Sequence, residues 1–237
     1  MTRLSVNINK LATLRNARGG DNPDVIEWTK QIQSYGAQGI TIHPRPDERH
    51  IRKSDVHALK QVVTTEFNIE GYPSREFLDL VKEVVPQQVT FVPDPPEVLT
   101  SNAGWDVIKH QAFLKDIMAE MRAAEIRTSV FMETDLKQME AVAKIGADRI
   151  ELYTESYATR MAAGESSVID EYRAAAECAK SLGLGVNAGH DLDLHNLKVF
   201  VEAIPFVEEV SIGHALVCDA LVYGMEKTVK LYLDALA

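Results

Sequence analysis

Histidine and glutamate residues stand at the ends of short apolar runs along this sequence. His43 closes GITIH, Glu70 lies in FNIEG, Glu151 lies in RIELY, His190 follows VNAG and His214 follows VSIG. Imidazole and carboxyl groups take and give protons, so several of them in one pocket would support a reaction made of successive proton transfers. A single glutamate at a strand end is more often a loop anchor, and the hypothesis therefore depends on these side chains converging.

Three local features indicate a phosphorylated ligand. The stretch HPRPDERHIRK carries Arg45 and His50 among its basic side chains, and LRNARGGD carries Arg15 and Arg18 beside two glycines. Gly213 leads from an apolar run into a helical stretch, whose free backbone N–H groups would face an anion. Basic loops alone are usually solvated, so the prediction of phosphate binding depends on the three features together.

Short β-rich runs alternate with longer runs of helical period, which is the pattern of parallel strands joined by crossover helices. Eight strands are predicted, at residues 4–8, 39–43, 67–71, 89–93, 128–133, 149–153, 184–188 and 209–213. Eight such units match the usual (β/α)8 barrel of about 250 residues. We predict an α/β fold, a (β/α)8 TIM barrel with a single domain over residues 1–237. A doubly wound open sheet is the competing fold, but no glycine-rich turn follows the first strand.

In a barrel the carboxyl ends of the strands meet at one mouth, so the polar residues at these ends can be gathered from the sequence. They are Asn7, Asn9, Lys10, His43, Glu70, Glu133, Glu151, His190 and His214. Glu133 is the weakest candidate, because the Thr134-Asp135 pair that follows it is typical of a helix cap.

Helix boundaries are marked by capping residues. Asn22 followed by Pro23 predicts the start of one helix, and Ser74 predicts the start of another. Residues 36–40 are echoed by residues 146–150, each time with a glycine at a helix end before a strand. The echo predicts that the two strands turn equivalent residues toward the barrel axis.

The composition argues against several classes of partner. The chain has 25 Lys+Arg and 35 Asp+Glu, a formal net charge of −10, which gives no field for a nucleic-acid backbone. No stretch approaches the roughly 18 apolar residues of a membrane helix, and no leader precedes the first strand. We expect a cytoplasmic protein that binds neither nucleic acid nor membrane.

Metal and thiol chemistry are not indicated. The first strand ends in Asn7-Ile8-Asn9 and not in the His-x-His of barrel metallohydrolases, and His43 and His50 lack ligand spacing. Cys178 and Cys218 show no disulfide or zinc pattern, and their contexts predict small buried hydrophobic side chains. We expect no metal ion in the site.

Six blocks in order along the chain resemble the pyridoxine 5'-phosphate synthase family, barrel enzymes that close the vitamin B6 ring. They are VNINKLATLRNARGG at residues 6–20, GITIHPRPDERHI at 39–51, FNIEG at 67–71, IELYTESYA at 150–158, VNAGH at 186–190 and SIGHAL at 211–216. The resemblance implies condensation of 1-deoxy-D-xylulose 5-phosphate with 3-amino-2-oxopropyl phosphate, releasing inorganic phosphate and water. It implies no metal, nicotinamide or other cofactor, and it implies a homo-octamer.

The resemblance also implies catalytic roles. His43 and Glu70 match the family's two proton acceptors, and His190 matches its proton donor. Glu151 takes the place of the carboxylate that stabilises the transition state.

Substrate contacts follow from the same resemblance. The amino ketone phosphate would be held by Asn7, Arg18, Gly213 and His214, and the deoxyxylulose phosphate by Arg45, His50 and Thr100. Asn9 and Lys10 stand where the family more often has Asp-His, at a corner that contacts the sugar phosphate. Asp191 stands where glycine is common, and a backbone N–H contact to substrate is expected there.

Two other functions remain open from the residues alone. One is a phosphosugar aldolase or isomerase in which Lys10 forms a Schiff base. The other is a phosphate-ligand binding protein, which would retain Arg18, Arg45 and the Gly213 site. Such a protein would not need two glutamates and two histidines together, and this favours an enzyme.

Overall fold

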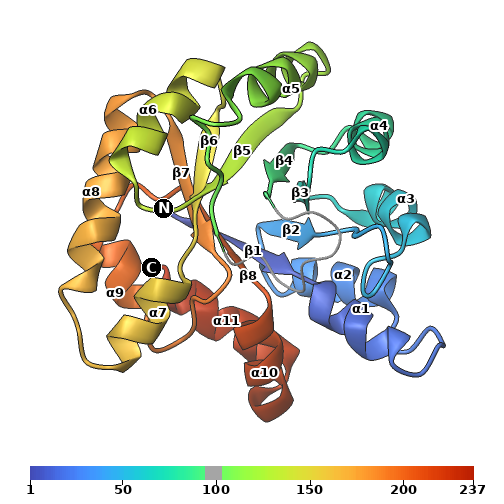
Figure 1. Cartoon of the computed structure of the whole chain (residues 1–237). Helices are drawn as coiled ribbons and strands as arrows, with labels where there is room; N and C mark the ends of the chain where they lie inside the picture. The colour runs from blue at the N-terminus through green and yellow to red at the C-terminus, as the bar shows by residue number, and fades with distance from the viewer. Residues whose placement is uncertain (94–102) are drawn as a thin grey trace.

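Eight parallel strands close into a barrel in a computed structural model of the chain, which describes residues 1–93 and 103–237 (Figure 1). The strands are β1 (Arg3–Asn7), β2 (Gly39–Ile42), β3 (Glu66–Gly71), β4 (Gln88–Phe91), β5 (Arg127–Met132), β6 (Arg149–Leu152), β7 (Gly185–Gly189) and β8 (Glu209–Ile212). Each strand pairs with the next, and β8 returns to β1 with Glu209 beside Arg3. This closure confirms the predicted (β/α)8 TIM barrel and excludes the doubly wound open sheet.

Helices surround the strands in the order expected for a barrel (Figure 1). They are α1 (Asn9–Asn16), α2 (Val25–Ser34), α3 (Lys53–Val62), α4 (Arg75–Val84), α5 (Gln111–Ala123), α6 (Leu136–Ile145), α7 (Glu155–Ala162), α8 (Val168–Ser181), α9 (Leu197–Ala203), α10 (His214–Tyr223) and α11 (Met225–Ala235). Helices α1, α7 and α10 follow β1, β6 and β8 within a few residues and precede the helix that completes the unit. They therefore begin at the mouth of the barrel. Among the described residues, no helix combines the length and apolar character needed to cross a membrane.

Helix caps are partly as predicted. Ser74 caps α4, and its hydroxyl accepts a hydrogen bond from the backbone N–H of Phe77 at 3.2 Å. The prediction at Asn22 and Pro23 is wrong, because α2 starts at Val25 and is capped by Asp24. The Asp24 carboxylate accepts from two backbone N–H groups and also opposes the positive end of the helix dipole. Its charge makes it the better cap at this position.

The two faces of each strand differ in polarity. Outward residues such as Leu4, Val6, Ile40 and Ile42 are fully buried against the helices. The barrel interior is instead lined by polar side chains that bond to one another, including Ser5 to Thr41, Thr90 to Asn68 and Asn187 to Gln88. Barrel interiors are normally filled by branched aliphatic residues. The charged groups at the mouth of the barrel therefore lie above a layer of hydrogen-bonded polar side chains.

Candidate active site

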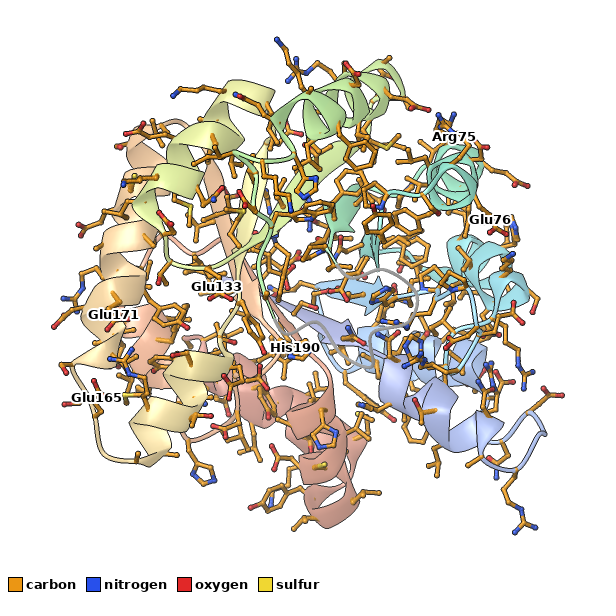
Figure 2. All side chains as sticks on the ribbon, viewed as in Figure 1. Arg75, Glu76, Glu133, Glu165, Glu171 and His190 are labelled. Carbon is orange, nitrogen blue, oxygen red and sulfur yellow. The ribbon has the colours of Figure 1, made fainter. Side chains whose placement is uncertain are left out.

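One cavity of about 630 Å³ lies at the carboxyl ends of the strands and gathers the four predicted catalytic side chains. Its lining includes His43, Glu70, Glu151 and His190 together with Asn7, Asn9, Lys10, Arg45, His50, Asp191, Gly213 and His214. In Figure 2, His190 lies toward the centre of the view, whereas the labelled Arg75, Glu76, Glu165 and Glu171 lie at the periphery. Residues from position 7 to position 214 thus share a single hollow.

His43 is held directly after β2 by an asparagine of the first strand end. Its backbone N–H donates to Asn9 Oδ1 at 2.9 Å, and Asn9 N–H donates to Asn7 Oδ1 at 3.1 Å. Burial, together with the charges of the neighbouring His50 and Arg45, lowers the pKa of the His43 imidazole to about 3. His43 is therefore neutral near pH 7 and ready to accept a proton.

Glu70 and Glu151 are neighbouring carboxyls in the floor of the cavity. Asn7 Nδ2 donates to Glu70 Oε2 at 3.4 Å, and the Glu151 residue is only 4 % exposed. Burial raises the pKa of both groups, and the charge of Glu209 adds to the effect on Glu70, as the charge of Glu70 does on Glu151. Two such carboxyls hold protons at a pH where ordinary glutamates have lost them.

His190 lies opposite, after β7, with Asp191 beside it. Its Nδ1 is 3.0 Å from Asp191 Oδ2, and the edge of its ring packs on Tyr153 with the centroids 6.0 Å apart. The backbone N–H of Asp191, which was expected to contact substrate, donates to Gly189 O at 2.9 Å and to Thr154 Oγ1 at 3.3 Å. The loop uses this N–H group within the protein.

The basic groups separate into two kinds. Arg45 is 5 % exposed and lines the cavity with His50, whose pKa falls to about 4 because of burial and then of the Arg45 charge. His50 Nδ1 accepts the backbone N–H of Ile51 at 3.0 Å, so in the neutral ring Nε2 carries the proton and can donate to a phosphate oxygen. Arg15, in contrast, is buried in a two-pronged ion pair with Asp55, with both N–O distances 2.8 Å.

One predicted phosphate contact does not line the cavity. Arg18 is exposed in the turn that follows α1 and is not among the residues that line the cavity. Thr100 lies outside the described residues.

Gly213 at the start of α10 packs closely against Asn7. A Cβ on Gly213 would lie 3.0 Å from Asn7 Cβ and 3.1 Å from Asn7 O. Gly213 precedes His214, the first residue of α10, so this helix start faces the cavity as the sequence predicted. The close approach lets backbone groups reach an anion without a side chain in the way.

Some lining residues were not identified as candidates from the sequence. These are Thr13, Arg49, Val92, Phe131, Tyr153, Glu155 and Ser211. Tyr153 packs its ring 5.2 Å from Phe131, and it stands two residues after Glu151 on the same strand face. The echo of residues 36–40 at residues 146–150 already predicted that Tyr153 faces inward with Glu151, although it predicted no role for Tyr153.

The remaining strand-end candidates lie at the margin. Glu133 is exposed, and its Oε1 accepts the backbone N–H of Gly104 at 3.2 Å, while Asp135 caps α6 as predicted. Lys10 is exposed at the rim, without the burial that usually activates a Schiff-base lysine.

The expectation for the thiols is half wrong. Cys178 is partly buried and packs on the core, but Cys218 is exposed on α10 with its Sγ 3.6 Å from His214 Nε2.

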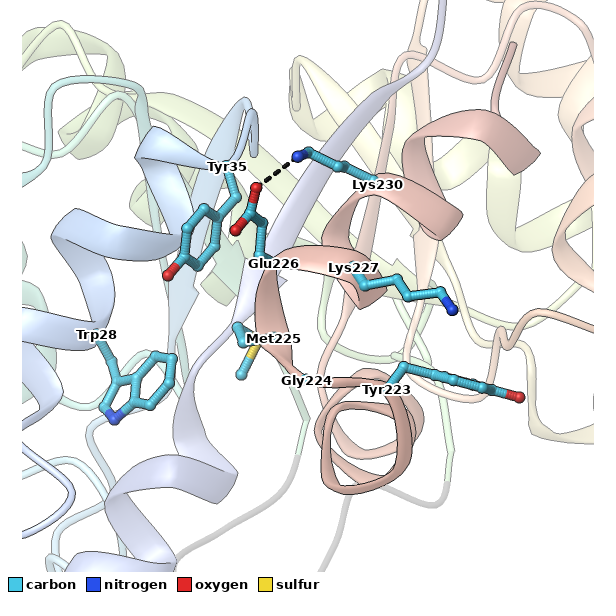
Figure 3. A pocket seen from close by; sticks show the side chains of 8 residues that line it. All are labelled: Trp28, Tyr35, Tyr223, Gly224, Met225, Glu226, Lys227 and Lys230. Atoms are coloured by element: carbon cyan, nitrogen blue, oxygen red, sulfur yellow. Dashed lines mark hydrogen bonds and ion pairs between the residues drawn. The ribbon is translucent and has the colours of Figure 1, made fainter.

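A second cavity of about 520 Å³ lies beside α2 and the start of α11 (Figure 3). Trp28, Tyr35 and Met225 line it, together with Glu226 and Lys230, which pair with each other at 2.5 Å. No histidine and no pair of carboxyls lines this cavity. The chemistry therefore belongs to the cavity at the strand ends.

Solved structures of other barrels confirm the fold at low sequence identity. The tryptophan synthase α-subunit of Pyrococcus furiosus superposes with a TM-score of 0.66 over 98 % of both chains at 13 % identity. A phosphoribosylanthranilate isomerase from Thermotoga maritima gives 0.60 over 100 % of this chain and 98 % of its own, also at 13 % identity. At this identity the likeness concerns the fold alone.

Sequence comparison identifies the family. Residues 4–237 match the model of the family described as "Pyridoxal phosphate biosynthesis protein PdxJ". Pyridoxine 5'-phosphate synthase of Cytophaga hutchinsonii is 59 % identical over 100 % of this chain and 99 % of its own. The enzyme of the same name from Porphyromonas gingivalis is 56 % identical over 100 % of both chains. The chain belongs to the PdxJ family of pyridoxine 5'-phosphate synthases.

Proposed function

We propose that this enzyme condenses 1-deoxy-D-xylulose 5-phosphate with 3-amino-2-oxopropyl phosphate by acid/base catalysis, forming pyridoxine 5'-phosphate with release of inorganic phosphate and water. One observation carries the proposal. A single cavity holds a neutral imidazole at His43, an imidazole of raised pKa at His190, and two carboxyls of raised pKa at Glu70 and Glu151.

The reaction needs groups of both kinds. When the amine adds to a ketone, the nitrogen loses a proton, the carbonyl oxygen gains one, and the hydroxyl formed later leaves as water. His43 is suited to take a proton because it is neutral, and His190 is suited to give one because its pKa is raised. The carboxyl of Glu70 can take a proton from the substrate and return it in a later step, because burial raises its pKa to about 8. The carboxyl of Glu151 lies beside it and would stabilise the transition state, and burial raises its pKa as well.

Each substrate carries a phosphate, and the cavity offers two different surfaces for them. Arg45 and His50 supply side-chain donors on the β2 side, and Gly213 with the start of α10 supplies backbone donors on the β8 side. A guanidinium and a helix start are both favoured partners of phosphate. The presence of two different donor sets in one cavity supports two phosphorylated substrates bound together.

The test is a direct assay of the purified chain with both substrates. We expect a fluorescent pyridine product and inorganic phosphate to form in equal amounts, and neither to form when one substrate is omitted. A chain that leaves both substrates unchanged would overturn the proposal. A product that forms without phosphate release would point to an aldol-type reaction in its place.

The phosphate assignment is tested by binding. Arg45→Ala should weaken binding of 1-deoxy-D-xylulose 5-phosphate by about tenfold or more, since it removes a charge-assisted contact from a buried position. Arg18→Ala tests the amino ketone phosphate assignment, which rests on the family resemblance because Arg18 does not line the cavity. Unchanged affinity for both substrates in either variant, measured by calorimetry, removes that arginine from the site.

We also propose that the chain forms a homo-octamer through a surface that includes the end of α10. Leu221, Val222 and Tyr223 are 80 %, 74 % and 47 % exposed, and Tyr223 lines the cavity of Figure 3. In and beside α11, Tyr232 and Leu236 are buried within the chain itself, whereas Leu231 and Leu233 are half-buried. Leu221→Asp with Val222→Asp should lower the mass measured by light scattering. An unchanged mass would remove α10 from the interface.

A further inference from the structure

We propose that the Asp191 side chain positions the His190 imidazole as the proton donor of this site. The carboxylate is a positioning residue that acts through His190. The kinetic part of the inference rests on the proposed function, whereas the structural part concerns the imidazole alone and can be tested without substrate.

The backbone around His190 is fixed in an uncommon conformation. His190 has φ of +66°, a left-handed value that side chains other than glycine rarely adopt. Its N–H donates to Ser211 O at 3.0 Å, and the next N–H, that of Asp191, donates to Gly189 O at 2.9 Å. Asn196 Nδ2 bonds the Asp191 carbonyl at 3.2 Å. The loop is therefore secured on both sides of the residue pair, and the two side chains are presented to each other.

The contact between the side chains specifies which ring nitrogen faces the substrate. Asp191 Oδ2 lies 3.0 Å from His190 Nδ1. A carboxylate only accepts hydrogen bonds, so Nδ1 must carry a hydrogen, and Nε2 is the nitrogen left to exchange a proton with a ligand. Tyr153 packs against one side of the ring. Asp191 thus orients the imidazole and selects its reactive atom.

The charges around the ring favour its protonated form. Burial alone lowers the pKa of His190, but the Asp191 hydrogen bond and charge, followed by the charge of Glu151 on β6, outweigh it and raise the pKa above its ordinary value. Lys10 and His43 face the ring from the β1 and β2 side, and Lys10 opposes this rise. Of the carboxylates that act on His190, Asp191 is the one in hydrogen-bond contact.

The two histidines across the cavity show what Asp191 contributes. The groups that shift the pKa of His43 are cationic or imidazole side chains, and together with burial they lower it to about 3. His190 differs by its adjacent carboxylate, and its pKa moves in the opposite direction. The acid and the base of one cavity therefore differ in their neighbours, and Asp191 is the neighbour of His190 that contacts the ring directly.

Asp193 provides a matched control in the same loop. Its carboxylate accepts from the backbone N–H groups of His195 and Asn196 at 2.8 and 3.0 Å, and it makes no ion pair with a histidine among the described residues. Asparagine also accepts such turn hydrogen bonds, so Asp193→Asn removes one charge while keeping the turn. Asp191→Asn removes one charge from the His190 contact itself.

The first experiment follows deuterium exchange at the His190 imidazole carbon against pH, by mass spectrometry of its peptide in the ligand-free protein. In the parent we expect the midpoint of the exchange rate against pH, which reports the pKa of His190, to lie above the ordinary histidine value of 6.5. Asp191→Asn should lower it by about one unit, as loss of an adjacent charge does. Asp193→Asn should leave the exchange midpoint close to that of the parent. Asp191→Glu should keep the midpoint nearer to that of the parent than Asp191→Asn does. A midpoint that stays the same in Asp191→Asn overturns the proposal.

The second experiment measures turnover against pH with both substrates. In Asp191→Asn the alkaline limb of kcat should move to lower pH, and kcat above the parent midpoint should fall about tenfold, since one pKa unit changes the protonated fraction tenfold. KM should hold for both substrates. If Asp191→Asn lowers the exchange midpoint of His190 but leaves the alkaline limb of the kcat profile in place, His190 is not the proton donor that limits turnover. If the parent makes no product, the proposed function fails, while the exchange result still decides the positioning of His190.

Discussion

The two ends of the barrel hold buried charged groups in opposite ways. At the amino end, Glu66 pairs with Arg3 at 2.7 Å and with Arg127, and Arg149 pairs with Glu208. At the carboxyl end, Glu70 and Glu151 lie near each other, and no ion pair of 4 Å or less joins either to a cation among the described residues. Cations therefore hold Glu66 and Glu208 at the amino end, whereas Glu70 and Glu151 at the carboxyl end are left to burial.

This difference shows how one scaffold provides both stability and reactivity. A buried acid with a cation in contact stays ionised, so its proton is not available near pH 7. A buried acid without such a cation costs stability when it ionises, and its pKa moves into the working range. Glu209 lies between the ends, 1 % exposed, and burial raises its pKa to about 7 although Arg3 and Arg149 oppose the rise.

The largest effect expected at the carboxyl end is on turnover. Glu70→Gln and His43→Asn should each lower kcat by about 10² to 10⁴, with KM changed little, because each removes a proton-transfer group and keeps most of the shape. The unfolding free energy of Glu70→Gln should not fall, since the amide replaces a carboxyl without a cationic partner. Steady-state kinetics and urea unfolding measure both. Near-normal turnover in the two variants would remove these residues from the mechanism.

The converse is expected at the amino end. Glu66→Gln should lower the unfolding free energy by about 1 to 3 kcal/mol, because its side chain is 8 % exposed and two arginines would lose their partner. Its kcat should remain that of the parent, since Glu66 does not line the cavity. A large fall in kcat with unchanged stability would mean that the two ends are not separate in function.

The pH dependence of stability gives a smaller and signed effect. Burial raises the pKa of Glu70 from 4.5 to about 8, so between these values the folded state binds more protons than the unfolded state, and stability falls as pH rises. His43 has its pKa lowered from 6.5 to about 3, so the unfolded state binds more protons in that window, and stability falls as pH decreases. Urea unfolding should be measured across both pH windows. In Glu70→Gln the unfolding free energy should fall less as the pH rises from 4.5 to about 8, and in His43→Asn it should fall less as the pH decreases from 6.5 to about 3. Parent-like slopes in both variants would contradict these shifts.

The strand ends were predictable because they combine two strong signals. Strand alternation and unit count fixed which residues face the axis, and a glutamate or histidine at the end of an apolar run is conspicuous. His43, Glu70, Glu151 and His190 were therefore located at the cavity from the sequence.

Loop residues were less predictable because their partners are remote or conformational. Arg15 and Arg18 stand three residues apart in one basic stretch, yet Arg15 pairs with Asp55, 40 positions away, and Arg18 is exposed. The Asp191 contact depends on a left-handed residue that no local pattern marks. Cys218 has an apolar context, but α10 turns this face of the helix outward. Each outcome depends on where a helix or loop points, which short-range pattern does not encode.

The smallest effect concerns a strand-end glutamate that stands outside the cavity. Glu133 follows β5 as Glu70 ends β3, but it is exposed and bonds the backbone N–H of Gly104. Glu133→Gln keeps an acceptor oxygen, so it should change the unfolding free energy by less than about 0.5 kcal/mol, as most surface substitutions do, and should leave kcat and its pH profile unchanged. Glu133→Gln and Glu70→Gln make the same chemical change, but the Glu70 side chain lines the cavity and the Glu133 side chain is exposed. If Glu133→Gln lowers turnover as Glu70→Gln does, position at a strand end rather than burial in the shared cavity would be what makes a glutamate catalytic here.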